Sequence, residues 1–412
     1  MRISFPALIA IGLGWLCLTV RDTDAVVIAE GKARVDEQTL AGVVANARIQ
    51  AYDLSPDGRR VALFVVSGDH IQAPSFIVMV SAADSQILKQ VHLGTSRQYV
   101  QGYAPQVAFA ANGRLLVVQD GQTVNVFDAA TLAAVRTIAP DTGSRFDVPA
   151  AIATSVKSAT VAISFGTGAA VINYMDKQPV HIAMVDVSTG KQVGAWDADD
   201  VPFSISPNAE YVALSDHSTS SRVMGVAILD TRTGSRLITL TGGFPNRAGG
   251  YPDWKGTSKD QFWTRIIAKF ISDDELVMTP DGNKDQSGSD IGASLKVVRF
   301  KDTQVTQEIT PENYGPTGEI AVSANQNTFV AISRYIAPKY LTHHLRVPPD
   351  SKPELLVFRR RQILELETRT HLRPLLTLRM RGPFEIADLR ISADGSVISV
   401  AEDYGVTILT RK

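Results

Sequence analysis

One short phrase of polar turn residues recurs seven times along the chain, and this repeat limits the fold more than any other feature. Each copy separates two apolar runs. Asp, Asn and Gly tolerate the left-handed backbone of tight turns, and Ser or Asp side chains can bond the turn's own amides. The copies are Ser55-Pro56-Asp57-Gly58, Ala111-Asn112-Gly113, Ser155-Val156-Lys157, Ser206-Pro207-Asn208, Ser272-Asp273-Asp274, Ser323-Ala324-Asn325 and Ser392-Ala393-Asp394-Gly395. A fold of seven similar units is expected.

Each unit is predicted to be a sheet of four strands. In the clearest copy, strands flank Asn112-Gly113 within 107–118, and further strands cover 123–128 and 134–138. Period-two alternation and β-branched residues mark each run as a strand, and Asn-Gly is a strong hairpin turn. Such a sheet cannot bury both faces alone, so copies must stack radially, and roughly four to eight of them close a ring. The predicted fold is all-β, a β-propeller of about seven four-stranded blades.

The two ends of the chain are expected to complete the last blade together. After the last turn, only the runs 396–401 and 406–411 remain, which leaves this blade one strand short. The segment 25–29 (Ala-Val-Val-Ile-Ala) is the predicted missing strand, which would close the ring and remove exposed edges. A stack of separate β-sandwiches is the alternative, but sandwiches do not require the same turn seven times.

The later part of the repeat carries a resemblance to a known family. Val126-Phe127-Asp128 is echoed by Met184-Val185-Asp186 and Ile228-Leu229-Asp230. The order of these phrases, strongest over 106–138 and 182–240, resembles the WD40-like and YVTN-type propeller repeats of bacterial secreted proteins. It departs from true WD40 proteins because Trp-Asp occurs only at Trp196-Asp197 and no Gly-His pair precedes the strands. Such propellers include binding scaffolds, lactonases and dehydrogenase subunits, so the resemblance implies a fold and no single activity.

The N-terminus is predicted to be a signal peptide covering residues 1–25. Arg2 precedes a nearly uncharged apolar run over 5–20, and Thr23 and Ala25 suit the small positions before a cut. The run is shorter than the roughly 20 residues of a spanning helix, so an uncleaved anchor is the less favoured alternative. Cleavage after Ala25 leaves the propeller as 26–412, in a secreted or periplasmic protein with no transmembrane segment in its mature chain.

Composition excludes several classes of site. Lys and Arg number 41 against 42 Asp and Glu, so no concentrated positive field for nucleic acid is expected. The only cysteine, Cys17, lies in the signal run, so the mature chain would lack disulfides, cysteine nucleophiles and Cys-ligated zinc. No phosphate loop, dinucleotide fingerprint, haem motif, zinc signature or Gly-x-Ser-x-Gly occurs. Neither a cofactor nor a metal is predicted.

A long segment between the fourth and fifth units is the first candidate for partner binding. It runs from Thr241 to Phe262, and loops of this length in a compact ring are commonly functional or disordered. Its aromatic residues Phe244, Tyr251 and Trp254, together with Trp263 just after it, are predicted to form a lip at the mouth of the ring. The alternative is that they only pack the loop onto the blade tops.

A second insertion, 335–349 in the sixth unit, is the other candidate. His343 and His344 are adjacent, but neighbours on an extended chain point opposite ways and no further ligand stands at a suitable spacing, so metal binding is not predicted. The stretch 334–381 is basic and could dock an anionic partner. The alternative is a solvated strand edge. The candidate residues here are Tyr340, His343, His344, Arg346, Arg359, Arg360 and Arg361.

A third loop, 281–290, superficially resembles a calcium loop. Oxygen side chains alternate along it, but Gln286 stands where a Gly is needed and Gly292 where a bidentate Glu would sit. A flexible polar hairpin loop is the favoured interpretation.

The predicted function is a non-catalytic extracytoplasmic module that binds another protein or an anionic glycan through its long loops. The alternative is a lactonase-like hydrolase with its site at the central funnel. A third class is a subunit of a larger complex, which needs a broader apolar patch. Carboxylates or histidines converging on the channel would favour the enzyme, and an aromatic rim with a plain channel would favour binding.

Overall fold

Over the residues that it describes, the computed structural model contains β-strands and one short helix, α2 (Glu37–Leu40). The described strands form seven four-stranded sheets, and every strand pair with a described register is antiparallel. This confirms the prediction of an all-β propeller. The residues that the structure describes are 31–68, 72–97, 105–120, 123–139, 148–155, 157–166, 180–198, 202–216, 225–241, 268–278, 295–309, 320–325, 327–334, 353–359, 376–379, 389–402 and 405–410.

Six of the sheets are continuous in sequence. The first contains β2 (Ala47–Leu54), β3 (Arg60–Ser67), β4 (Gln72–Ser81) and β5 (Ile87–Arg97). The second contains β6 (Gln106–Ala110), β7 (Leu115–Asp120), β8 (Thr123–Asp128) and β9 (Ala134–Ile138). The third contains β10 (Val148–Thr154), β11 (Thr160–Gly166), β12 (Val180–Asp186) and β13 (Lys191–Ala198).

The next three sheets repeat the same order. The fourth contains β14 (Pro202–Ile205), β15 (Tyr211–Asp216), β16 (Gly225–Asp230) and β17 (Arg236–Thr241). The fifth contains β18 (Ala268–Phe270), β19 (Glu275–Met278), β20 (Leu295–Arg299) and β21 (Gln304–Ile309). The sixth contains β22 (Ile320–Val322), β23 (Thr328–Arg334), β24 (Pro353–Arg359) and β25 (Leu376–Arg379).

The seventh sheet joins the two ends of the chain. It contains β26 (Leu389–Ile391), β27 (Val397–Glu402), β28 (Gly405–Thr410) and, beside β28, β1 (Gly31–Asp36). Gly31 is opposite Thr410 and Asp36 is opposite Gly405. The N-terminal strand in this sheet is therefore 31–36 and not the predicted 25–29, which lies outside the described residues.

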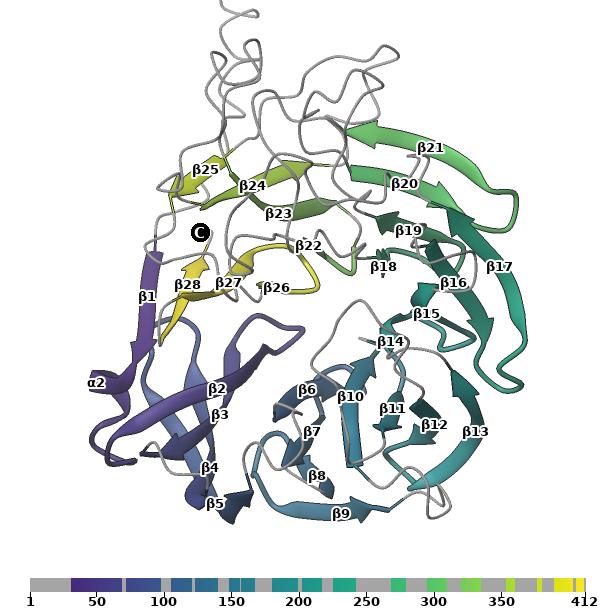
Figure 1. The fold of residues 1–412 in the computed structure, drawn as a ribbon. Coiled ribbons are helices and arrows are strands. Elements are labelled where there is room, and N and C mark those ends of the chain that lie inside the picture. Colours follow the sequence, from purple (N-terminus) through teal and green to yellow (C-terminus); the bar gives the residue numbers. More distant parts are fainter. Residues whose placement is uncertain are drawn as a thin grey trace, which may run out of the picture.

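The sheets are arranged radially, with the first strand of each nearest the centre (Figure 1). Neighbouring inner strands contact each other: β2 with β6, β6 with β10, β10 with β14, β14 with β18, β18 with β22, and β22 with β26. The last inner strand, β26, also contacts the first, β2.

The middle strands differ from the predicted alternation. In β3 every residue between the two ends of the strand, from Val61 to Val66, is buried. The outer strand β9 is mostly exposed. The reason is that both faces of an interior strand are covered by neighbouring sheets, so continuous apolar runs replace alternation there. One core cluster, for example, joins Phe64 and Ile77 of the first sheet to Phe109 and Leu116 of the second.

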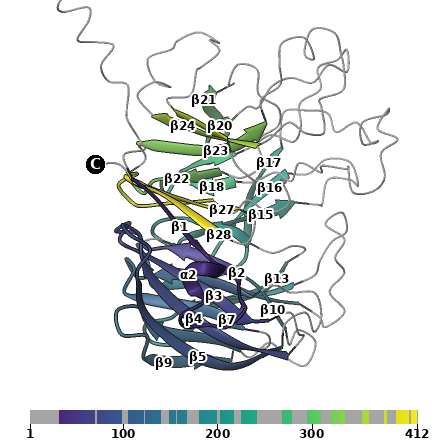
Figure 2. The ribbon, with the colours of Figure 1, turned by 90° about the vertical axis from the view of Figure 1, so that its left-hand side faces the viewer.

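Antiparallel order gives the ring two different faces. Connections from the first to the second strand, and from the third to the fourth, lie on one face, here called the turn face. Connections from the second to the third strand, and from one sheet to the next, lie on the opposite face, here called the loop face. Figure 2 shows the ring from the side, with the strands of the first sheet running across its width.

Candidate functional site

The turn face is built from the seven turns found in the sequence. Each lies between the first and second strands of its sheet. In the first sheet, the buried Ser55 hydroxyl donates to the Asp57 carboxylate and accepts from the Arg60 amide at 2.9 Å. In four other turns the serine hydroxyl likewise donates to the side-chain oxygen of the Asp or Asn that follows two positions later. These serines are Ser206, Ser272, Ser323 and Ser392. In each of these turns the serine hydroxyl therefore stabilises the turn by hydrogen bonds to its other residues.

Two turns depart from this pattern. Ser155 donates instead to the Pro207 carbonyl of the next sheet and accepts from the Ser158 amide. In the second sheet the serine is replaced by Ala111, and Ala111, Asn112 and Gly113 all have positive φ, which Asn and Gly adopt at low cost. In this turn, the tolerance of Asn112 and Gly113 for positive φ takes the place of the serine hydrogen bonds.

Neighbouring turns are bonded to one another. The Ala111 amide donates to the Ser158 carbonyl, and the Asn208 amide donates to the Asp273 carboxylate at 2.8 Å. At the junction of the seventh and first sheets, the Ala393 amide donates to the Pro56 carbonyl at 2.7 Å. Hydrogen bonds therefore connect several neighbouring turns of the turn face, and such bonds oppose local opening of the turns.

A second set of turns on this face, between the third and fourth strands, is organised by aspartates. Hydrogen bonds from the Thr131 hydroxyl and amide hold the pKa of Asp128 below its ordinary value of 3.8. At Asp186, burial by itself would raise the pKa, but bonds from Ser188 and Thr189 outweigh it and lower the pKa. The Thr233 amide, against a smaller effect of burial, lowers the pKa of Asp230. Asp57 and Asp394 in the serine turns also have lowered pKa values.

These shifts predict that the ring loses stability in acid. A group with a lowered folded-state pKa stabilises the fold above its unfolded pKa, and this contribution is lost as the pH falls through the folded value. We expect the free energy of unfolding, measured with urea, to fall progressively below about pH 4. A variant with Asp128→Asn, Asp186→Asn and Asp230→Asn keeps a turn acceptor at each site and should show a shallower fall. An equally steep fall in this variant would contradict the assignment.

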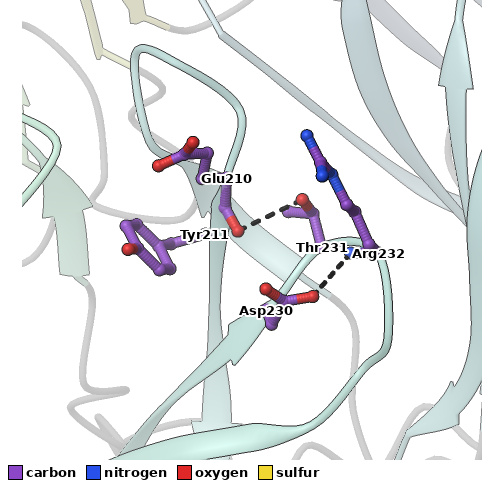
Figure 3. Close-up of a pocket in the computed structure, with 5 residues that line it drawn as sticks. All are labelled: Glu210, Tyr211, Asp230, Thr231 and Arg232. Atoms are coloured by element: carbon purple, nitrogen blue, oxygen red, sulfur yellow. Dashed lines mark hydrogen bonds between the residues drawn. The ribbon is translucent and has the colours of Figure 1, made fainter.

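One shallow hollow opens in the fourth sheet, at its turn-face end. It is lined by Glu210, Tyr211, Asp230, Thr231 and Arg232 (Figure 3). The Thr231 hydroxyl donates to the Glu210 carbonyl at 3.1 Å, and the Arg232 amide donates to the Asp230 carboxylate at 2.9 Å. Two acidic side chains and one basic side chain therefore line this hollow, and the hydrogen bonds of the two turns hold its Thr231 hydroxyl and Asp230 carboxylate in place.

The inner strands are tied together by side chains that bond the edge amides of the next strand. The Phe109 amide donates to the Asp53 carboxylate at 2.7 Å, the Ile152 amide donates to Gln106, and the Phe270 amide donates to Ser204. These bonds cross from the first sheet to the second, the second to the third, and the fourth to the fifth. Side chains of the channel wall are thus engaged in holding the sheets together.

Asp53 also forms the ion pair at the junction of the first and seventh sheets. Arg390 Nε lies 3.0 Å from the second Asp53 oxygen, and the guanidinium stacks over the Tyr52 ring at 5.8 Å from its centroid. The Tyr52 hydroxyl donates to the Ser399 carbonyl of β27. One mostly buried carboxylate therefore contacts three consecutive sheets. No local pattern in the sequence indicates this cluster, because Asp53 and Arg390 are 337 positions apart.

The predicted site residues fall almost entirely outside the described residues. This holds for Phe244, Tyr251, Trp254, Tyr340, His343, His344, Arg346, Arg360 and Arg361, and for the loop 281–290. Arg359 ends β24, opposite Thr328 of β23. β24 pairs with β23 on one side and with β25 on the other, and its register with β25 covers Glu354 to Val357.

The described strand ends nevertheless place both candidate insertions. The segment 242–267 connects Thr241, at the end of a fourth strand, to Ala268, at the start of a first strand. The segment 335–352 connects Arg334, at the end of a second strand, to Pro353, at the start of a third. Both pairs of strand ends belong to the loop face, so the two insertions leave the ring on the same side.

The described residues contain neither a metal cluster nor a membrane span. Within the ranges given above, no group of three or more His, Cys, Asp or Glu is placed to hold a metal ion. In the same ranges, no helix is long and apolar enough to cross a membrane.

Comparisons with known proteins show the fold alone. No protein-family model and no curated protein matches the chain. Among solved structures, a hydrazine synthase of Kuenenia stuttgartiensis is similar over 89% of this chain and 97% of its own, at 14% identity and a TM-score of 0.56. A chain of a mitotic checkpoint complex is similar over 93% of this chain and 94% of its own, at 12% identity and a TM-score of 0.51.

Proposed function

We propose that the protein is a non-catalytic binding or scaffold module that recognises its partner with the loop face of the propeller. The observation that carries this proposal is the shared face of the two insertions at Thr241–Ala268 and Arg334–Pro353. Variation concentrated in loops on a repetitive frame is where recognition usually lies. The opposite face consists of short turns locked by serine and by bonds between neighbours.

We infer that the seven sheets are the blades of one closed ring. Support comes from the contact of β26 with β2, from the pairing of β1 with β28, and from the Asp53–Arg390 ion pair across the same junction. Joining both chain ends in one blade covers the edge that β28 would otherwise expose.

The inner strands favour binding over the alternative of a lactonase-like hydrolase. Over their described ranges, the seven inner strands contain a single carboxylate, Asp53, and no histidine. That carboxylate already accepts bonds from Phe109 and Arg390. A hydrolytic site in the channel needs several titratable groups that converge on one point.

The partner we propose is another protein or an anionic glycan. The residues proposed to contact it are Phe244, Tyr251, Trp254, Tyr340, His343, His344, Arg346, Arg359, Arg360 and Arg361. The aromatic residues supply large contact area, and the arginines supply charge and bidentate hydrogen bonds to acidic groups. One similar fold belongs to a mitotic checkpoint complex, and membership of a complex agrees with a binding role.

We further propose that the repeats are of the WD40-like or YVTN type and that the protein acts outside the cytoplasm after loss of residues 1–25. The repeat type rests on the phrases ending at Asp128, Asp186 and Asp230. The location rests on the N-terminal charge and apolar run. Gly31 and Thr410 both lie at the turn face, so a tag at the C-terminus leaves the loop face accessible.

The proposal is tested by capture on immobilised protein that is attached through its C-terminus. The mature chain is compared with a variant in which residues 340–349 are replaced by a short Gly-Ser linker. A second variant carries Phe244→Ser, Tyr251→Ser and Trp254→Ser. Envelope proteins are identified by mass spectrometry, and heparin serves as the anionic glycan. The matched control, Arg114→Gln with Lys157→Gln, removes exposed charges from the turn face.

We expect the parent and the turn-face control to retain the same protein or heparin, and at least one insertion variant to lose it. Equal capture by all variants would sink the site assignment. Hydrolysis of lactone substrates by the purified chain, lost in a channel variant, would favour the hydrolase.

A further inference from the structure

We draw no further inference here: the strongest candidate, the row of exposed apolar residues at the bulges of the outer strands β5, β9, β13 and β17 (Leu88, Val135, Val193 and Leu237), lies beside cations that are matched by ionised turn aspartates, so nothing in the structure shows what covers it.

Discussion

Replacing Asp53 with alanine is expected to lower the free energy of unfolding by about 3 kcal/mol, because it removes half of a largely buried ion pair. The Phe109 amide loses the acceptor that lies 2.7 Å away, and Arg390 loses its carboxylate at 3.0 Å. The arginine side chain keeps 34% exposure and can recover some hydration, which keeps the loss at the lower end for such pairs. The first loss falls on the junction between the first and second sheets, and the second loss falls on the junction between the first and seventh sheets. Urea unfolding measures the effect.

Two further variants separate the hydrogen bond from the charge. Asp53→Asn retains an oxygen for the Phe109 amide and should cost about 1 kcal/mol. Asp302→Ala breaks an exposed pair with Arg299, in which the aspartate is 49% exposed, and should change stability by less than about 0.5 kcal/mol. If Asp53→Ala lowers the free energy of unfolding no more than Asp302→Ala does, the proposed contribution of Asp53 to ring closure is contradicted.

Much of the frame could be predicted from the sequence because its determinants are local. Ser55 bonds Asp57 and Arg60, and Asp230 bonds Arg232 and Thr233, all within five positions. A motif this short can be recognised in the sequence because the same residue types recur at the same spacing. The need for an N-terminal strand in the last sheet could also be predicted, although its position at 31–36 could not.

The remaining features are set by contacts between distant segments. Nothing near Asp53 in the sequence indicates Arg390, and the bulges at Leu88 or Val135 arise from the register of a neighbouring strand. Continuous burial of 61–66 likewise depends on sheets that pack against both faces. The insertions could be recognised as long connections, but their shared face follows only from the direction of the strands that flank them.

We propose that the two ends of the chain close the ring, and the arrangement of both faces depends on this proposed closure. Gly31 and Thr410 are opposite each other in the register of β1 and β28. Cysteines at both positions, Gly31→Cys and Thr410→Cys, are therefore suitably placed for a cross-link, with Cys17→Ser to remove the only natural thiol. Such a bond would constrain nearly the whole unfolded chain. It should raise the free energy of unfolding by up to about 5 kcal/mol.

The most direct measurement is the gel mobility and urea unfolding of this variant, oxidised and reduced, beside a control with Gly31→Cys and Ser235→Cys. A closed ring predicts a reducible cross-link within one chain for the first variant, with higher stability when oxidised, and no such cross-link for the control. Monomers that remain reduced, cross-links only between chains, or equal cross-linking in the control would contradict closure.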